Sequence, residues 1–136
     1  MSQADGLDIL PAYVLDASAL LAFVHGEVGA DIIGPLLSSS VISSVNWVEV
    51  LQRAISLNLG TQGRREDLES LGLHILPFDA EDAESTALLW PSTRRAGLSL
   101  GDRACLSLAQ KLALPALTAD RVWRTLGLEV EVRLIR

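Results

Sequence analysis

Short apolar runs alternate with longer amphipathic stretches along this chain, and this alternation constrains the fold more than any other feature of the sequence. The short runs are bounded by proline, glycine, serine or aspartate, as buried strands are. We predict strands at residues 12–15, 41–42, 73–78, 115–118 and 129–135. Strands that alternate with helices are typical of a parallel sheet covered on both faces, so we predict a three-layer α/β/α sandwich.

The longer stretches place apolar residues three and four positions apart, as the buried face of a helix requires. In one of them Trp47, Val50 and Ala54 share a face, and Ser43 or Ser44 can cap the first turn. This pattern predicts helices at 18–24, 28–37, 44–57, 64–71, 79–90, 101–112 and 120–126. A chain of 136 residues suits one hydrophobic core, so we assign 1–136 to a single domain, with 1–11 as an N-terminal extension.

The composition excludes several kinds of site. Cys105 is the only cysteine, so an intrachain disulfide and a cysteine-rich zinc site are impossible. No segment approaches the roughly 18 apolar residues of a membrane span, and residues 1–10 lack the pattern of a signal peptide. We therefore predict a cytoplasmic protein. The net charge of −6 counts against nucleic-acid binding, unless bound cations invert the local field.

Three aspartates lie where predicted elements begin or end. Asp16 follows the first strand, Asp102 opens a helix, and Asp120 comes two residues after Thr118 at the end of another strand. Ligands of open α/β sheets bind beyond the carboxyl ends of the strands, so these side chains could share one edge. Each also has a simpler explanation, because an aspartate that caps a helix contributes about 1 kcal/mol without any catalytic role.

Helical periodicity leaves the position of Glu49 undecided. This residue lies nearly opposite the apolar stripe of its helix, which predicts a solvated side chain. Val45 and Val48 lie on the same side as Glu49, however, and indicate that this face is partly covered.

A cluster of carboxylates has a clear chemical use. Neighbouring carboxylates resist joint ionisation, and a divalent cation relieves their repulsion. Mg²⁺ prefers oxygen ligands, lowers the pKa of a bound water and stabilises charge on a phosphoryl oxygen. Such a site needs no histidine or cysteine. We accordingly assign no function to His25 or His74 and place Cys105 in the core.

Four segments resemble, in order, the sequence motifs of PIN domains. They contain Asp16, Glu49, Asp102 and Asp120, and they span residues 14–20, 43–51, 98–106 and 117–123. The likeness extends from about Tyr13 to the C-terminus. The third and fourth motifs are most similar to those of VapC-type toxins from bacterial toxin–antitoxin pairs.

This resemblance implies a metal-dependent ribonuclease that hydrolyses RNA with a metal-activated water. By the resemblance, the four carboxylates of Asp16, Glu49, Asp102 and Asp120 would bind Mg²⁺ or Mn²⁺, and it is the resemblance that assigns Glu49 to the site. The hydroxyl groups of Ser18 and Thr118 would lie near the metal. The implied partners are the RNA substrate, a cognate antitoxin protein that blocks the cleft, and a second copy of the chain in a homodimer.

RNA would have to meet positive side chains despite the acidic total charge. Arg103 and Arg121 are the best candidates, because each adjoins a proposed metal ligand and a guanidinium can donate two hydrogen bonds to phosphate. Two other functions remain open. A non-catalytic interaction module would be expected to lack at least one of the four carboxylates, and all are present. A phosphatase with Asp16 as nucleophile would usually carry a second aspartate at the position of Ser18.

Overall fold

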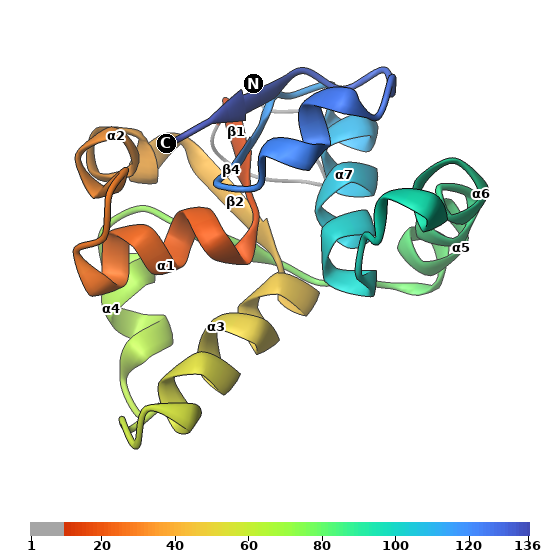
Figure 1. The fold of residues 1–136 in the computed structure, drawn as a ribbon. Coiled ribbons are helices and arrows are strands. Elements are labelled where there is room, and N and C mark those ends of the chain that lie inside the picture. Colours follow the sequence, from red (N-terminus) through yellow and green to blue (C-terminus); the bar gives the residue numbers. More distant parts are fainter. Residues whose placement is uncertain (1–9) are drawn as a thin grey trace.

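Five parallel strands form the centre of the computed structural model, which describes residues 10–136 (Figure 1). The strands are β1 (Tyr13–Leu15), β2 (Ser40–Ser43), β3 (His74–Leu76), β4 (Ala116–Thr118) and β5 (Val132–Leu134). Their spatial order is β3-β2-β1-β4-β5, and every neighbouring pair is parallel. The chain builds outward from β1 to β3 and then returns to the other side of β1 for β4. The strand order therefore reverses beside β1, which is where open α/β sheets bind ligands.

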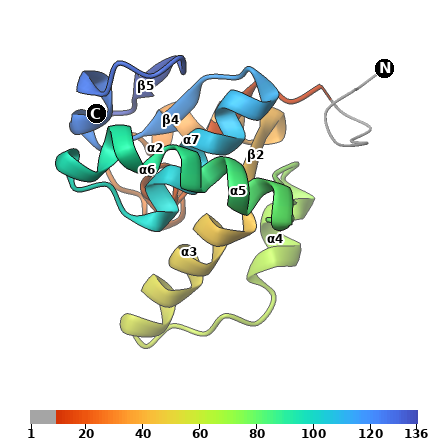
Figure 2. The ribbon, with the colours of Figure 1, turned by 90° about the vertical axis from the view of Figure 1, so that its right-hand side faces the viewer.

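Helices cover both faces of this sheet. On one side lie α1 (Ala17–His25) and α2 (Ala30–Leu36), with α3 (Ser44–Ser56) and α4 (Arg64–Ser70) extending the same layer (Figure 1). On the other side α7 (Leu100–Leu112) packs on the sheet, and α5 (Ala80–Leu88) and α6 (Trp90–Thr93) lie outside it (Figure 2). The described residues also contain three short 3₁₀ segments: η1 (Leu37–Ser39), η2 (Arg94–Ala96) and η3 (Arg121–Thr125).

The core is divided by the sheet into two clusters. Successive side chains of a strand point to opposite faces, and in β1 Leu15 belongs to the cluster beneath α1, whereas Val14 belongs to the cluster beneath α7. Ile42 and Val41 of β2 divide in the same way. Both faces are buried, which explains why the strands read as continuous apolar runs. The predicted three-layer α/β/α sandwich is confirmed.

Several predicted boundaries differ from the observed ones. The prediction of a strand over 129–135 was too long, because its partner β4 is only three residues long and only Val132–Leu134 pairs with it. The predicted helix 28–37 begins at Ala30, since Gly29 adopts a left-handed conformation with φ of 105°. The expected end near Trp90 is observed as a break between α5 and α6.

Two predictions concern the ends and the environment of the chain. The proposed N-terminal extension, residues 1–11, falls almost entirely outside the described residues and stays a prediction. Within residues 10–136, no single helix is long and apolar enough to cross a membrane. Two consecutive segments would be long and apolar enough only if taken together, and a bend of 103° separates them: Ala17–His25 and Ala30–Ser39.

Gly72, which connects α4 to β3, is a position where we expect a measurable cost from a single methyl group. Its φ is 99°, and a Cβ there would lie 2.7 Å from the Cα and Cβ of Ser38. Gly72→Ala should lower the free energy of unfolding by about 2–4 kcal/mol, through backbone strain and overpacking. Gly63→Ala is the matched control, because Gly63 has a φ of 80° and a Cβ added there would meet no atom within 4 Å. Urea denaturation should show a loss of only about 1–2 kcal/mol for that variant, and equal losses would contradict the proposed clash.

Candidate active site

Asp16 is held at the carboxyl end of β1 by hydrogen bonds to both of its carboxylate oxygens. Oδ1 accepts from the Ser18 hydroxyl at 2.7 Å and from the backbone N–H of Ala19 at 2.8 Å, and Oδ2 accepts from the Thr118 hydroxyl at 2.5 Å. The side chain is only 4% exposed. Asp16 is therefore the N-cap of α1, as its simpler explanation required, but it is also buried and oriented from two directions.

The same hydroxyl groups join the turns that follow β1 and β4. Ser18 Oγ accepts from the backbone N–H of Ala119 at 2.9 Å, and Thr118 Oγ1 accepts from the backbone N–H of Asp120 at 3.0 Å. Parallel strands β1 and β4 are adjacent, so their carboxyl ends bring these turns together. Ser18 and Thr118, for which the family resemblance implies a position near the metal, thus contact Asp16 directly.

Burial raises the pKa of Asp16 from 3.8 to about 6. The hydrogen bonds from Thr118, Ser18 and Ala19 stabilise the charged carboxylate and oppose this rise, while the negative charge of Asp102 adds to it. Asp16 is therefore a carboxylate whose charge is only partly compensated by its neighbours in the described structure.

Glu49 is half-buried and faces the first turn of α7. A Cβ on Gly101 would overlap its carboxylate, at 2.6 Å from Cδ and 2.7 Å from Oε2. Burial and the charge of Asp102 raise the pKa of Glu49, against a hydrogen bond from Asn46 that lowers it. Periodicity left the position of Glu49 undecided, and the structure shows a side chain that is neither fully solvated nor fully buried. Helix α7, on the other side of the sheet, covers this face, and the periodicity of α3 alone cannot show that cover.

Asp102 opens α7 and both caps the helix and faces the other carboxylates. Its Oδ2 accepts from the backbone N–H of Ser99 at 2.9 Å, and its own N–H donates to Ser99 Oγ at 3.1 Å, which forms a capping box. This cap uses one carboxylate oxygen, and Oδ1 accepts no hydrogen bond within residues 10–136. The charge of Asp102 acts on both Asp16 and Glu49.

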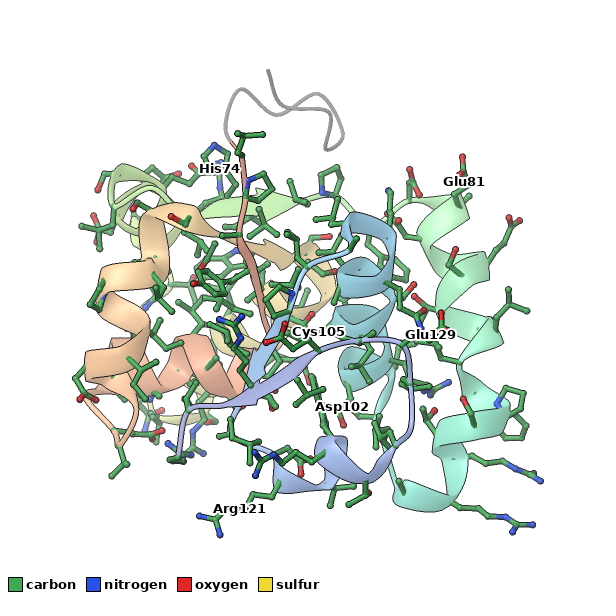
Figure 3. All side chains as sticks on the ribbon, turned by 90° about the horizontal axis from the view of Figure 1, so that it is seen from above. His74, Glu81, Asp102, Cys105, Arg121 and Glu129 are labelled. Atoms are coloured by element: carbon green, nitrogen blue, oxygen red, sulfur yellow. The ribbon has the colours of Figure 1, made fainter. Side chains whose placement is uncertain are left out.

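The charges of three of the four carboxylates act on the buried thiol of Cys105. Cys105 is one turn beyond Asp102 on α7 (Figure 3). Its pKa is raised well above the usual value by burial and by the charges of Asp16, Asp102 and Glu49. The thiol lies in the core, as predicted, and serves the packing beneath the site.

Asp120 stands at the margin of this region. Its Oδ1 accepts from the backbone N–H of Val122 at 3.0 Å, and the side chain is exposed as the N-cap of η3. Its charge is not among those that shift the pKa of Asp16, Glu49 or Cys105. The structure thus gathers Asp16, Glu49 and Asp102, and it leaves Asp120 beside them. Within residues 10–136, no three groups of metal-ligating type are close enough to hold one ion by themselves.

The donor set nevertheless fits a hard divalent cation. All four candidate ligands offer carboxylate oxygens, which Mg²⁺ and Mn²⁺ prefer. Mg²⁺ commonly keeps several waters and takes only one or two carboxylates from the protein, so a site of this kind does not need three direct ligands. Burial, and to a smaller extent the charge of Asp102, raises the pKa of Asp16 and Glu49, and a cation would offset both effects.

The two candidate RNA-binding arginines differ in their surroundings. Arg103 is partly buried, and its Nε donates to the Ser99 carbonyl at 3.4 Å. Arg121 is exposed on η3, and its side chain points outward (Figure 3). His74 lies on the opposite side of the molecule in this view.

Sequence reasoning missed two residues, Asn46 and Gly101. Asn46 Nδ2 donates to Glu49 Oε1 at 3.0 Å and to the Gly101 carbonyl at 2.9 Å. The signal for Asn46 was present, because residues three apart on a helix are neighbours. Gly101 gave no comparable signal, since its importance depends on the approach of another helix.

Comparisons with known proteins found a matching family and several similar folds. The sequence model of the PIN domain matches residues 13–127. A toxin–antitoxin complex from Klebsiella pneumoniae contains a chain of similar fold, with 20% identity and a TM-score of 0.67 over 88% of this chain and 99% of that one. DNA-bound VapBC from Salmonella typhimurium gives 16% identity and a TM-score of 0.67 over 93% and 99%.

A third similar structure is VapBC-5 from Mycobacterium tuberculosis, with 23% identity and a TM-score of 0.56 over 93% of this chain and 99% of that one. At these identities the likeness shows the fold alone. No curated protein sequence matches the chain significantly. The family model, in contrast, matches most of the chain and includes all four acidic motifs. The chain belongs to the PIN-domain family.

Proposed function

We propose that this chain is a Mg²⁺- or Mn²⁺-dependent endoribonuclease and the toxin of a toxin–antitoxin pair. The observation that carries the proposal is the position of Asp16 at the carboxyl end of β1, where the strand order reverses, together with the contact of the Glu49 carboxylate with the first turn of α7, which carries Asp102. The PIN-domain match supports a nuclease, and similar folds occur in a toxin–antitoxin complex and in a member of a family of toxin–antitoxin systems.

The residues have distinct tasks in this proposal. Asp16 and Asp102 would hold the ion, with Glu49 and Asp120 completing its surroundings. A bound ion of this class lowers the pKa of a water and neutralises charge on a phosphoryl oxygen. Ser18 and Thr118 fix the orientation of the Asp16 carboxylate, so the charged group is in place before RNA arrives.

The proposed partners follow from the similar structures and from the reaction. The Klebsiella pneumoniae structure is described as a toxin–antitoxin complex, and VapBC-5 from Mycobacterium tuberculosis is described as a member of a family of toxin–antitoxin systems. Both descriptions favour a protein antitoxin as the inhibitor of this chain. A homodimer remains part of the proposal. Cleavage of cellular RNA agrees with the cytoplasmic location expected from the sequence.

The test is RNA cleavage by the purified chain with Mg²⁺, with Mn²⁺ and with EDTA. Asp102→Asn keeps the size of the side chain but removes a charge from the site. Cleavage by the parent that disappears in EDTA and in the variant would support the proposal. If the parent fails to cut total cellular RNA but still binds Mn²⁺ by calorimetry, and the variant does not, the enzyme requires a specific RNA. If the parent neither cuts RNA nor binds metal, a non-catalytic interaction module remains as the function.

Arg103 and Arg121 should contribute to RNA affinity mainly through charge. Each contact between a basic side chain and a phosphate of a single strand makes the slope of log K against log salt steeper by about 0.7. Arg103→Ala and Arg121→Ala should each weaken binding several-fold and reduce this slope by about that amount. Fluorescence anisotropy with a short RNA in EDTA measures both.

Arg65→Ala is the control for this prediction. Arg65 is 57% exposed on α4 and already pairs with Glu66 and Glu69, so its loss should leave the slope unchanged. Equal effects of all three variants would mean that RNA binding depends on total charge and not on these two positions.

A further inference from the structure

Asn46 is a buried amide that connects α3 to α7. Its side chain is 1% exposed in the first turn of α3. Nδ2 donates one hydrogen bond to Glu49 Oε1 at 3.0 Å and one to the Gly101 carbonyl at 2.9 Å. Both amide hydrogens are therefore used, one within the helix and the other across to the helix that carries Asp102.

The oxygen of the Asn46 amide lowers the stability of the fold. Asn46 Oδ1 is buried and accepts no hydrogen bond from the described residues. A buried polar atom without a partner destabilises the fold, and an apolar side chain of similar shape would avoid this cost. The Gly101 carbonyl does not depend on Asn46, because it also belongs to the hydrogen-bond ladder of α7. Stability alone therefore does not explain an asparagine here.

We propose that Asn46 is a positioning residue, which holds the Glu49 carboxylate against the first turn of α7, beside Asp102. The geometry favours this role because Glu49 would otherwise be free to rotate outward from its half-buried position. One donor fixes the carboxylate, and the other ties the amide to the backbone of the opposite helix. The inference rests on the proposed function, since it concerns how the same site is assembled.

A purely structural role would have a different consequence. If Asn46 merely joined two helices, its loss would weaken the fold and would act independently of Glu49. If it positions Glu49, its loss should matter only while Glu49 is a carboxylate. Two residues in contact that serve one purpose show such non-additive effects in a double-mutant cycle.

The experiment compares Asn46→Leu, Glu49→Gln and the double variant with the parent. Leucine has a similar shape and removes both donors together with the unpaired oxygen. We expect a melting temperature equal to or above that of the parent, with Mn²⁺ affinity by calorimetry and RNA cleavage each reduced about 10- to 100-fold, as for other residues that orient a ligand. The double variant should be no worse than Glu49→Gln.

Thr86→Val is the matched control. Thr86 is 2% exposed on α5, and its hydroxyl is also buried without a partner. Removing that hydroxyl should leave Mn²⁺ affinity unchanged. Additive losses in the double variant, or a parent-like Mn²⁺ affinity in Asn46→Leu, would overturn the positioning role.

A metal-free measurement separates this inference from the proposed function. Hydrogen exchange of the Asn46 side-chain amide, followed by NMR in EDTA, should show two protected protons in the parent and one in Glu49→Ala. Failure of the parent to bind Mn²⁺ and to cut RNA would overturn the proposed function, whatever the exchange result. If both protons of the Asn46 amide stay protected in Glu49→Ala, that result by itself would overturn the link between Asn46 and Glu49.

Discussion

Replacing Asp16 by asparagine should abolish RNA cleavage and, at the same time, make the folded protein more stable at pH 7. Loss of a residue that merely orients a metal ligand costs about 10- to 100-fold, so loss of a ligand's charge should cost more than about 100-fold. The asparagine keeps the oxygen that Ser18 and Ala19 approach. The effect should therefore arise from charge and not from unfolding.

The stability gain follows from the direction of the pKa shift. The pKa of Asp16 is about 6 in the folded chain and about 4 in an unfolded one. The folded state therefore binds the Asp16 proton more tightly than the unfolded state does. The resulting contribution to the free energy of unfolding is complete below pH 4 and is lost as the pH rises through 6. A shift of about two units corresponds to about 3 kcal/mol. Asparagine avoids this penalty, with a net gain of about 1–3 kcal/mol after less favourable contacts with Thr118.

Urea denaturation of metal-free protein between pH 4 and pH 7 measures this difference. The curves of the parent and of Asp16→Asn should nearly coincide at pH 4 and separate up to pH 6, with the variant more stable. Asp79→Asn is the matched control, because Asp79 is also an N-cap but is exposed on α5. It should show no such separation and full cleavage. If Asp16→Asn is less stable than the parent at pH 7, the buried charge of Asp16 does not destabilise the fold, and this explanation is wrong.

Much of the fold could be predicted from the sequence because its strands are buried on both faces. Continuous apolar runs bounded by turn residues identify such strands, as at Val14 and Leu15 of β1. The boundaries that failed depend on partners instead. Residues 129–131 alternate like a strand, yet β5 can extend only as far as the short β4 allows. Pairing length is a property of two segments and cannot be read from one.

The candidate site divides in the same way. Asp16 and Asp102 could be predicted because a strand end and a helix start are visible in the sequence and lie at a known edge of the fold. Glu49 could not be placed by periodicity, since α7 covers a face that the helix itself presents as polar. The assignment of Glu49 came from its resemblance to a family motif. Asn46 and Gly101 have meaning only when α3 and α7 meet.

Gly101→Ala should reduce cleavage as much as Glu49→Gln does, although it adds only one methyl group outside the set of carboxylates. The added Cβ would occupy the space of the Glu49 carboxylate. Because this carboxylate is the end of a flexible side chain, it can rotate away with little cost to the fold. Alanine also favours the helix by up to about 1 kcal/mol relative to glycine. We therefore expect near-normal stability with a loss of activity of about 10- to 100-fold.

The matched control for this prediction is Gly34→Ala, in α2. Gly34 is also a helical glycine, and a Cβ there would meet only Phe23, at an ordinary contact distance of 3.5 Å. Both variants gain the same intrinsic preference for the helix, so only Gly101→Ala should lose Mn²⁺ affinity by calorimetry and cleavage in the RNA assay. Combining Gly101→Ala with Glu49→Gln should add nothing further, because the methyl group displaces a side chain that has already lost its charge. If Gly101→Ala cuts RNA at the parental rate, then Glu49 does not act from the position it occupies against α7, and its place in the site must be reconsidered.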